Sequence, residues 1–186
     1  TDFFMAISLP VAPGEIAEEL DYERGRLIFA GADSNEVRRS ILPGGVRVIT
    51  ERMPGTRGVS IGFWAGVGSR DEAPGMLGST HFLEHLLFKG TASRTALDIA
   101  QAFDEVGGES NALTAKEHTC YYARVLDDDV SMAIDVLADM VSNALLDPEH
   151  LEQERGVILE ELAMDQDDPT DVAFENFVEQ LMGDNP

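Results

Sequence analysis

The pattern of hydrophobic and polar positions first predicts regular structure between residues 36 and 66. Val37–Leu42 and Val46–Thr50 are each interpreted as a strand, and Pro43-Gly44-Gly45 between them predicts the turn of a hairpin. The next run, Gly58–Gly66, is more apolar and predicts a buried strand, in which the glycines indicate bulges or close backbone approach. This part of the chain therefore predicts the beginning of a sheet.

A helical period follows. Ser79 or Thr80 is expected to cap a helix that ends at Lys89-Gly90, and a capping box at Thr95 and Asp98 begins a second helix. The buried stripe predicted for this second helix consists of Leu97, Ala100, Phe103 and Val106, with Gly107-Gly108 at its end. Two strands, residues 109–114 and 119–126, then form a hairpin around the turn at residues 115–117.

Three more helices are predicted after this hairpin. The first runs from residue 127 to residue 144, and its inward positions are Val130, Ile134, Leu137 and Val141. Asp147-Pro148 and Asp168-Pro169 each place proline directly after an N-cap residue, so each begins a further helix, the last one running to about Met182. Because strands come as hairpins and helices gather in pairs, we predict an α+β fold with a mixed, largely antiparallel sheet and helices packed on one face.

Residues 1–33 lack such a pattern. Apolar residues precede Pro10 and Pro13, and an acidic stretch, Glu15–Asp21, follows them. We predict an N-terminal extension over residues 1–33, loosely packed or docked on a partner, and one domain over residues 34–186. A chain of 186 residues with 44% hydrophobic residues is long enough to bury the core of one domain.

Net charge and cysteine content limit the classes of binding partner and the cellular compartments that we expect for this protein. The 13 Lys and Arg against 35 Asp and Glu give a net charge of -22, which disfavours nucleic acid and anionic membranes and suits cationic peptides, although solubility explains the charge equally well. No apolar run approaches the roughly 18 residues of a membrane span. Cys120 is the only cysteine, which excludes an internal disulfide and fits a reducing compartment. With neither a secretory signal nor a transit peptide visible, we expect a bacterial cytoplasmic protein, or a mitochondrial matrix protein if a transit peptide was removed.

The candidate chemistry centres on His81-Phe82-Leu83-Glu84-His85. On a helix, positions i, i+3 and i+4 share a face, and the two histidines lie about 6 Å apart along the axis. Two imidazoles placed in this way can hold one zinc ion, while the carboxylate stops short of it and can move protons. The order is the reverse of His-Glu-x-x-His and is typical of the inverted zinc hydrolases, or inverzincins. A chance cluster on a polar helix face is the alternative.

A catalytic zinc takes three protein ligands and keeps an open position for water, so a third ligand must come from elsewhere. The candidates are two histidines, the cysteine and several carboxylates: His118, His150, Cys120, Glu154, Glu160 and Glu161. The carboxylates have the stronger case, because Glu154, Ile158, Glu161 and Asp165 share one face of the helix after Asp147. An acidic side chain facing inward beside apolar ones needs a charged partner. The residues alone do not choose among the three glutamates.

Six segments, in chain order, resemble the pitrilysin-type zinc peptidases, most closely the mitochondrial processing peptidase β-subunit and its bacterial homologues. They are Gly68–Glu72, His81–Thr91, Gly107-Gly108, Asn111–Thr114, Tyr121-Tyr122 and Glu154–Glu161. The resemblance covers the chain from Val37 to its end and implies a processing-peptidase-like metallohydrolase half.

This resemblance implies a role for each matching residue. The zinc ligands would be His81, His85 and Glu161, with Glu84 as the general base and Glu154 as a second catalytic acid outside the ligand set. The edge strand that pairs with an extended substrate would consist of Asn111, Ala112, Leu113 and Thr114. The implied function is that of a zinc metalloendopeptidase, a hydrolase that cleaves peptides or unfolded, presequence-like polypeptides with metal-activated water.

Members of this family are built from two similar halves that close around the substrate. We therefore interpret the chain as the N-terminal portion of a larger peptidase, which binds zinc but hydrolyses peptides poorly by itself. The second half would come from the same chain or from a partner subunit, and a homodimer is also compatible with the sequence. Two alternatives are a non-catalytic assembly or binding subunit of the same family, and an enzyme like S-ribosylhomocysteine lyase with Cys120 as the third ligand.

Overall fold

The structure is a computed structural model that describes residues 3–8, 17–21, 26–30 and 36–183. The chain divides into two compact units, Thr1–Leu145 and Leu146–Pro186. The first unit contains the sheet and three α-helices, and the second contains two α-helices.

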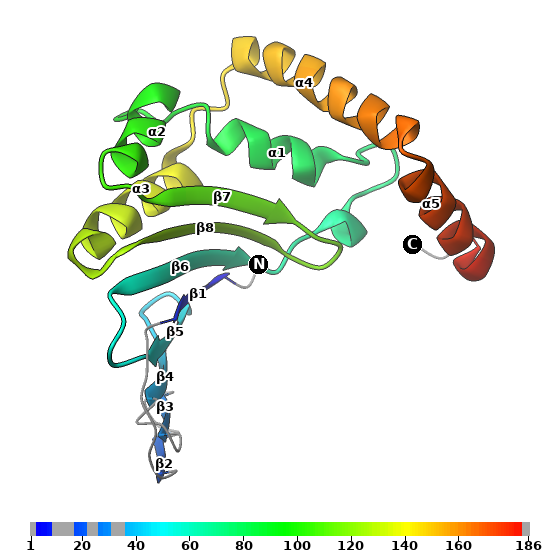
Figure 1. The fold of residues 1–186 in the computed structure, drawn as a ribbon. Helices are drawn as coiled ribbons and strands as arrows, with labels where there is room; N and C mark the ends of the chain where they lie inside the picture. The colour runs from blue at the N-terminus through cyan, green and yellow to red at the C-terminus, as the bar shows by residue number, and fades with distance from the viewer. Residues whose placement is uncertain (1–2, 9–16, 22–25, 31–35, 184–186) are drawn as a thin grey trace. The chain divides into compact units, whose positions relative to one another are not determined.

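An eight-stranded sheet organises the first unit, with the strand order β2-β3-β4-β5-β1-β6-β8-β7 (Figure 1). The strands are β1 (Phe3–Ser8), β2 (Ala17–Asp21), β3 (Arg26–Ala30), β4 (Glu36–Ile41), β5 (Arg47–Arg52), β6 (Gly58–Ala65), β7 (Glu109–Thr114) and β8 (Thr119–Leu126). β1 pairs parallel with β5, whereas the other described pairings are antiparallel. The predicted mixed, largely antiparallel sheet is therefore confirmed.

The first three strands lie in the segment that the sequence presented as an extension. β1 is inserted between β5 and β6, and β2 and β3 extend the sheet beyond β4. The parallel pairing of β1 with β5 joins residues far apart in the chain, so no hairpin pattern in the sequence predicts this pairing. The remaining residues of the segment lie outside the described ranges, and the domain boundary at residue 34 stays a prediction.

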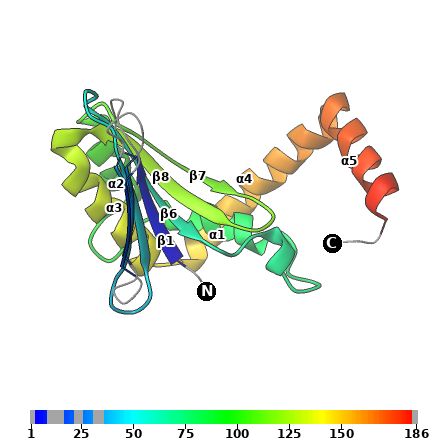
Figure 2. The same cartoon turned by 90° about the horizontal axis from the view of Figure 1, so that it is seen from below.

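The helices of the first unit are α1 (Ser79–Leu87), α2 (Ala96–Asp104) and α3 (Val130–Asn143). They cover one face of the sheet formed by β6, β8 and β7, as Figures 1 and 2 show. The core lies between the two layers. Its most buried members include Ile61 on β6, Ala123 on β8, Ile99 and Phe103 on α2, and Leu137 and Met140 on α3. The predicted packing of helices on one face is confirmed for this unit.

The predicted buried stripe of α2 is confirmed at Phe103 and Val106 and wrong at Leu97 and Ala100. Leu97 and Ala100 are exposed, while Ile99 and Phe103 are buried and Val106 packs against the core from beyond the helix end. Both sets of residues satisfy a helical period, and only the orientation against β7 and α3 distinguishes them.

The inward face of α3 is predicted more closely. Leu137 is fully buried, and Val130, Ile134 and Val141 flank the core, although Ala133 and Met140 occupy its centre. The α-helix also begins later than expected, because residues 127–129 form a short 3-10 turn.

The second unit consists of α4 (Pro148–Asp167) and α5 (Pro169–Met182). Both predicted N-caps are confirmed: the Asp147 carboxylate accepts from the backbone N–H of Glu149 at 2.8 Å, and that of Asp168 from Thr170 at 2.7 Å. The less exposed positions of α4 are His150, Leu151, Glu154, Ile158 and Glu161, whereas Asp165 is exposed. Within the described residues, no helix combines the length and the apolar character needed to cross a membrane.

Candidate metal centre

The two histidines of the inverted motif lie on one face of α1 with their rings together. The Nε2 atoms of His81 and His85 are 3.2 Å apart, and the ring planes are perpendicular with centroids 4.8 Å apart. Two nitrogens bound to one tetrahedral zinc at the usual Zn–N distance are separated by about 3.3 Å. The rings therefore already have the spacing that a shared zinc ion requires.

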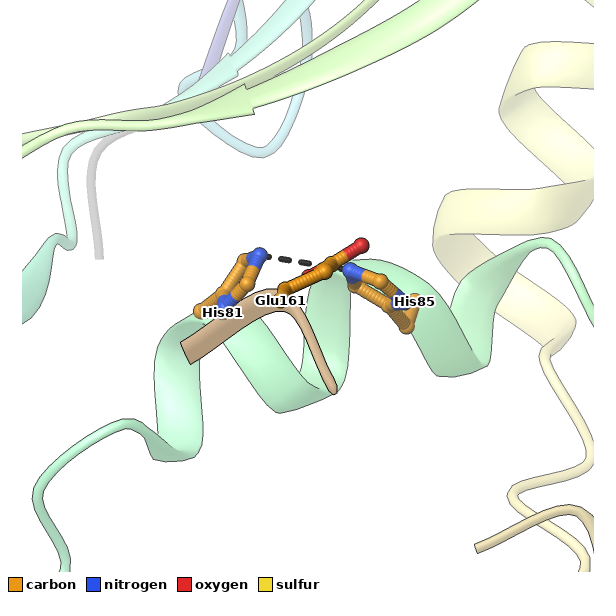
Figure 3. Close-up of side chains that lie close together, drawn as sticks. All are labelled: His81, His85 and Glu161. Atoms are coloured by element: carbon orange, nitrogen blue, oxygen red, sulfur yellow. Dashed lines mark hydrogen bonds between the residues drawn. The ribbon is translucent and has the colours of Figure 1, made fainter. Parts of the chain in front are cut away.

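Glu161 of α4 belongs with the two histidines to one group of possible metal ligands. One nitrogen from each histidine and one carboxylate oxygen of Glu161 all lie within 4.8 Å of one another, and Figure 3 shows the three side chains. All three residues are partly buried. Two imidazoles and one carboxylate are a donor set that catalytic zinc sites use, with a fourth position left for water. The residues present thus fit a zinc ion.

The other candidate ligands do not belong to this group among the described residues. Glu160, next to Glu161 in the chain, is exposed, whereas Glu154 is 5% exposed. His118 stacks on Trp64 with ring centroids 5.1 Å apart.

Cys120 is on β8 with its side chain away from the helices. Its Sγ lies near Gly62, in a shallow pocket that Trp64 and Tyr122 also line. Burial raises the pKa of this thiol to about 11, so it is protonated at neutral pH. Cys120 is buried and is not a member of the group of possible ligands among the described residues, so it fits the role of a buried core residue better than that of a ligand.

The carboxylate of Glu84 is held by a residue of the predicted substrate strand. The hydroxyl of Thr114, at the end of β7, donates a hydrogen bond to Glu84 Oε2. Tyr121 lies close by, and burial, together with the charge of Glu84, raises the pKa of its phenol. The sequence indicated Glu84 and Thr114 separately, but nothing in their spacing predicted that they touch.

β7 is the last strand of the sheet, so one of its edges faces no other described strand. Its residues alternate: Asn111 and Leu113 are exposed, whereas Ala112 packs against the core and Thr114 is partly buried. The edge position predicted for Asn111–Thr114 is confirmed. An edge strand offers unpaired N–H and C=O groups to an extended peptide.

The predicted cap of α1 is wrong. The N-cap is Gly78, with φ of +85°, and neither Ser79 nor Thr80 caps the helix through its side chain. The carboxylate of Glu72 does so from the preceding loop, accepting from the backbone N–H groups of Gly78 and Thr80. No sequence pattern identifies such a cap, because it is six to eight residues away.

His81, Glu84 and His85 on one helix face are typical of the metal-binding hydrolases with the inverted motif. Residues 47–186 match the family described as Insulinase (Peptidase family M16). Because the match covers most of the chain, the chain belongs to this family. The resemblance inferred from the ordered motifs is thereby confirmed for the family, and the lyase alternative is left without support.

Three bacterial relatives illustrate the similarity. An uncharacterized zinc protease of Streptomyces coelicolor is 58% identical over 149 residues, which are 80% of this chain and 32% of that protein. One of Mycobacterium leprae is 57% identical over 162 residues, 87% of this chain and 36% of that protein. One of Bacillus subtilis is 46% identical over 139 residues, 75% of this chain and 34% of that protein. The chain thus spans about a third of the length of these relatives.

A solved structure supports the fold. The crystal structure of a protease from Helicobacter pylori superposes with a TM-score of 0.63 and 28% identity, covering 66% of this chain and 30% of that chain. The predicted α+β class is therefore confirmed both by the arrangement of the elements and by a related protease.

Proposed function

We propose that this chain carries the zinc-binding catalytic residues of a metalloendopeptidase that cleaves peptides or unfolded polypeptides in extended form. The observation that carries the proposal is the grouping of three possible metal ligands. The Nε2 atoms of His81 and His85 are 3.2 Å apart, and Glu161 belongs to the same group. These three residues would hold the zinc ion. When bound, zinc supplies polarisation of the scissile carbonyl and a water acidic enough to lose a proton near neutral pH.

Glu84 is the group of this chain that moves the proton. It lies on the same helix face as the histidines and between them in the chain, but it is not a member of the group of possible ligands formed by His81, His85 and Glu161. As general base it takes the proton of the attacking water and then delivers it to the departing amine. The Thr114 hydroxyl holds its carboxylate in one orientation, and Glu154, buried on α4, is the second acid.

The substrate would bind along the free edge of β7. An added strand pairs with backbone groups, so it is selected first for being extended and only then for its side chains. The contact between Thr114 and Glu84 joins the end of this strand to the general base. The strongly negative chain would also attract cationic peptides over a distance.

The chain covers about a third of its relatives, and we propose that a second homologous half completes the site. It would come from the same polypeptide or from a partner subunit. A processing-peptidase substrate preference and a bacterial cytoplasmic location are part of the same proposal.

Zinc content of four variants tests the ligand set. Purified wild-type protein, reconstituted with zinc and freed of excess metal, is expected to retain zinc in stoichiometric amount. Glu161→Gln loses its metal because an amide is a poor zinc ligand, and His85→Ala does the same. Glu160→Gln is the matched control, since it removes the same charge from the exposed neighbouring position.

Cys120→Ala separates the peptidase from the cysteine-ligated alternative and is expected to keep its zinc. Loss of zinc from Cys120→Ala with retention in Glu161→Gln would overturn the ligand assignment. Equal zinc in Glu160→Gln and Glu161→Gln would remove Glu161 from the set.

A further inference from the structure

Helix α1, which carries both histidines, begins without a cap of its own. Its N-cap, Gly78, has no side chain to accept from the first turn. Instead, each carboxylate oxygen of Glu72 accepts one hydrogen bond from the start of the helix. Oε2 accepts from the N–H of Gly78 and Oε1 from that of Thr80, both at 2.7 Å. Thr80 directly precedes His81. The first turn of the metal-binding helix is therefore held by a residue outside the helix.

Glu72 is itself fixed, because the loop before it lies against the turn between β7 and β8. The backbone N–H of Ser69 donates to the carbonyl of Ala115 at 3.1 Å, and that of Arg70 to the carbonyl of Lys116 at 2.9 Å. Gly68 has no space for a side chain, since a Cβ there would lie 2.3 Å from the Ala115 oxygen.

Side chains add to this attachment. The guanidinium of Arg70 pairs with Glu117 in that turn, and within the loop itself the Asp71 carboxylate accepts from the Gly68 N–H at 2.9 Å. The Gly68–Glu72 segment thus joins two parts of the site, the end of the edge strand and the start of the metal-binding helix.

From this geometry we propose that Glu72 is a positioning residue for the metal centre, which keeps the first turn of α1 formed so that His81 remains in register with His85. The proposal rests on the zinc site proposed above. The N–H groups of a helix's first turn have no partners within the helix, and without a cap the turn frays. His85, one turn further on, is held by the rest of the helix, so fraying would displace His81 alone and separate the two nitrogens.

The charge of Glu72 strengthens this role. Burial by itself would raise the pKa of this carboxyl group, but hydrogen bonds from Thr80, Gly78 and Ser79 outweigh burial and hold the pKa below its usual value. The group is therefore ionised at neutral pH. A carboxylate at a helix N-terminus also interacts favourably with the helix dipole.

The matched control is Asp98, whose carboxylate takes part in capping the N-terminus of α2. Its carboxylate accepts from the backbone N–H and the hydroxyl of Thr95, in the capping box at the start of that helix. α2 carries none of the proposed ligands. Asp98→Ala therefore removes a cap and some stability without touching α1, and it reports what general destabilisation does to zinc binding.

The experiment measures zinc affinity by competition with a chromophoric chelator in wild-type protein, Glu72→Ala, Glu72→Gln and Asp98→Ala. Urea unfolding of the metal-free proteins gives their stabilities. We expect Glu72→Ala to bind zinc roughly 10- to 100-fold more weakly, as is typical when a group that orients a ligand is removed. Glu72→Gln keeps the acceptor oxygen and should recover part of the loss, whereas Asp98→Ala should bind as wild type does.

Cobalt substitution supplies a second readout, because the visible spectrum of bound cobalt reports its coordination geometry. Its bands should change in Glu72→Ala and stay unchanged in Asp98→Ala. Wild-type affinity in Glu72→Ala, or an equal loss in Asp98→Ala at equal stability, would overturn the role of Glu72 while leaving the zinc site intact. Failure of the wild-type protein to bind zinc would overturn both proposals.

Discussion

Alanine substitution at Ile99 and at Leu97 tests which face of α2 is buried. The two residues are two positions apart in the same nine-residue helix, and each substitution removes three carbon atoms. The hydrophobic pattern favours Leu97 as the buried residue. In the structure, Leu97 is 64% exposed and Ile99 is 2% exposed. The two variants are therefore expected to differ strongly.

The expected magnitude follows from this burial. At about 0.8 kcal/mol for each buried carbon, Ile99→Ala loses about 2.4 kcal/mol of transfer free energy. The cavity left behind adds to this, so we expect a loss of about 3–4 kcal/mol in the free energy of unfolding, within the usual range for such sites. Leu97→Ala should change it by less than about 0.5 kcal/mol, because its side chain is largely in water and alanine favours helix.

Trp64 provides the assay. It is the only tryptophan of the chain and lies on β6, in the unit that contains α2, so its fluorescence during urea titration follows the unfolding of that unit. At about 2–4 °C per kcal/mol for a chain of this size, Ile99→Ala should melt about 6–16 °C below the wild type. A larger loss in Leu97→Ala than in Ile99→Ala would show that the described orientation of α2 is wrong.

Two further predictions concern the site and the pH dependence of stability. Glu84→Gln should retain its zinc but lower kcat roughly 10²- to 10⁴-fold in a form extended to the length of the relatives, because the general base is lost; turnover at the wild-type rate would contradict the assignment. Hydrogen bonds from Ser93, Thr91 and other neighbours hold the pKa of Asp139 well below its usual value. A depressed carboxyl pKa stabilises the fold above the unfolded-state pKa of about 4, and this contribution is lost as the pH falls through the folded-state pKa. Thermal melts of Asp139→Asn should accordingly depend less on pH below about pH 4 than those of the wild type, and parallel curves would count against the network.

The sequence determines the features of this protein that depend on neighbours a few positions away. The capping box at Thr95 and the caps at Asp147 and Asp168 are formed as predicted, because each joins residues two or three positions apart. The shared face of His81 and His85 follows in the same way from the helical repeat. The inverted motif could therefore be identified before any fold was known.

Long-range contacts decide the rest. No sequence pattern predicts three of the observed features. They are the insertion of β1 between β5 and β6, the burial of Ile99 in place of Leu97, and the cap that Glu72 provides for α1. The sequence alone also left Glu154, Glu160 and Glu161 open as the third ligand, and the proposal of Glu161 rests on its grouping with the two histidines. Periodicity tells which residues share a face of a helix, but which face is buried depends on the surface that the helix meets. That surface exists only once the chain has folded.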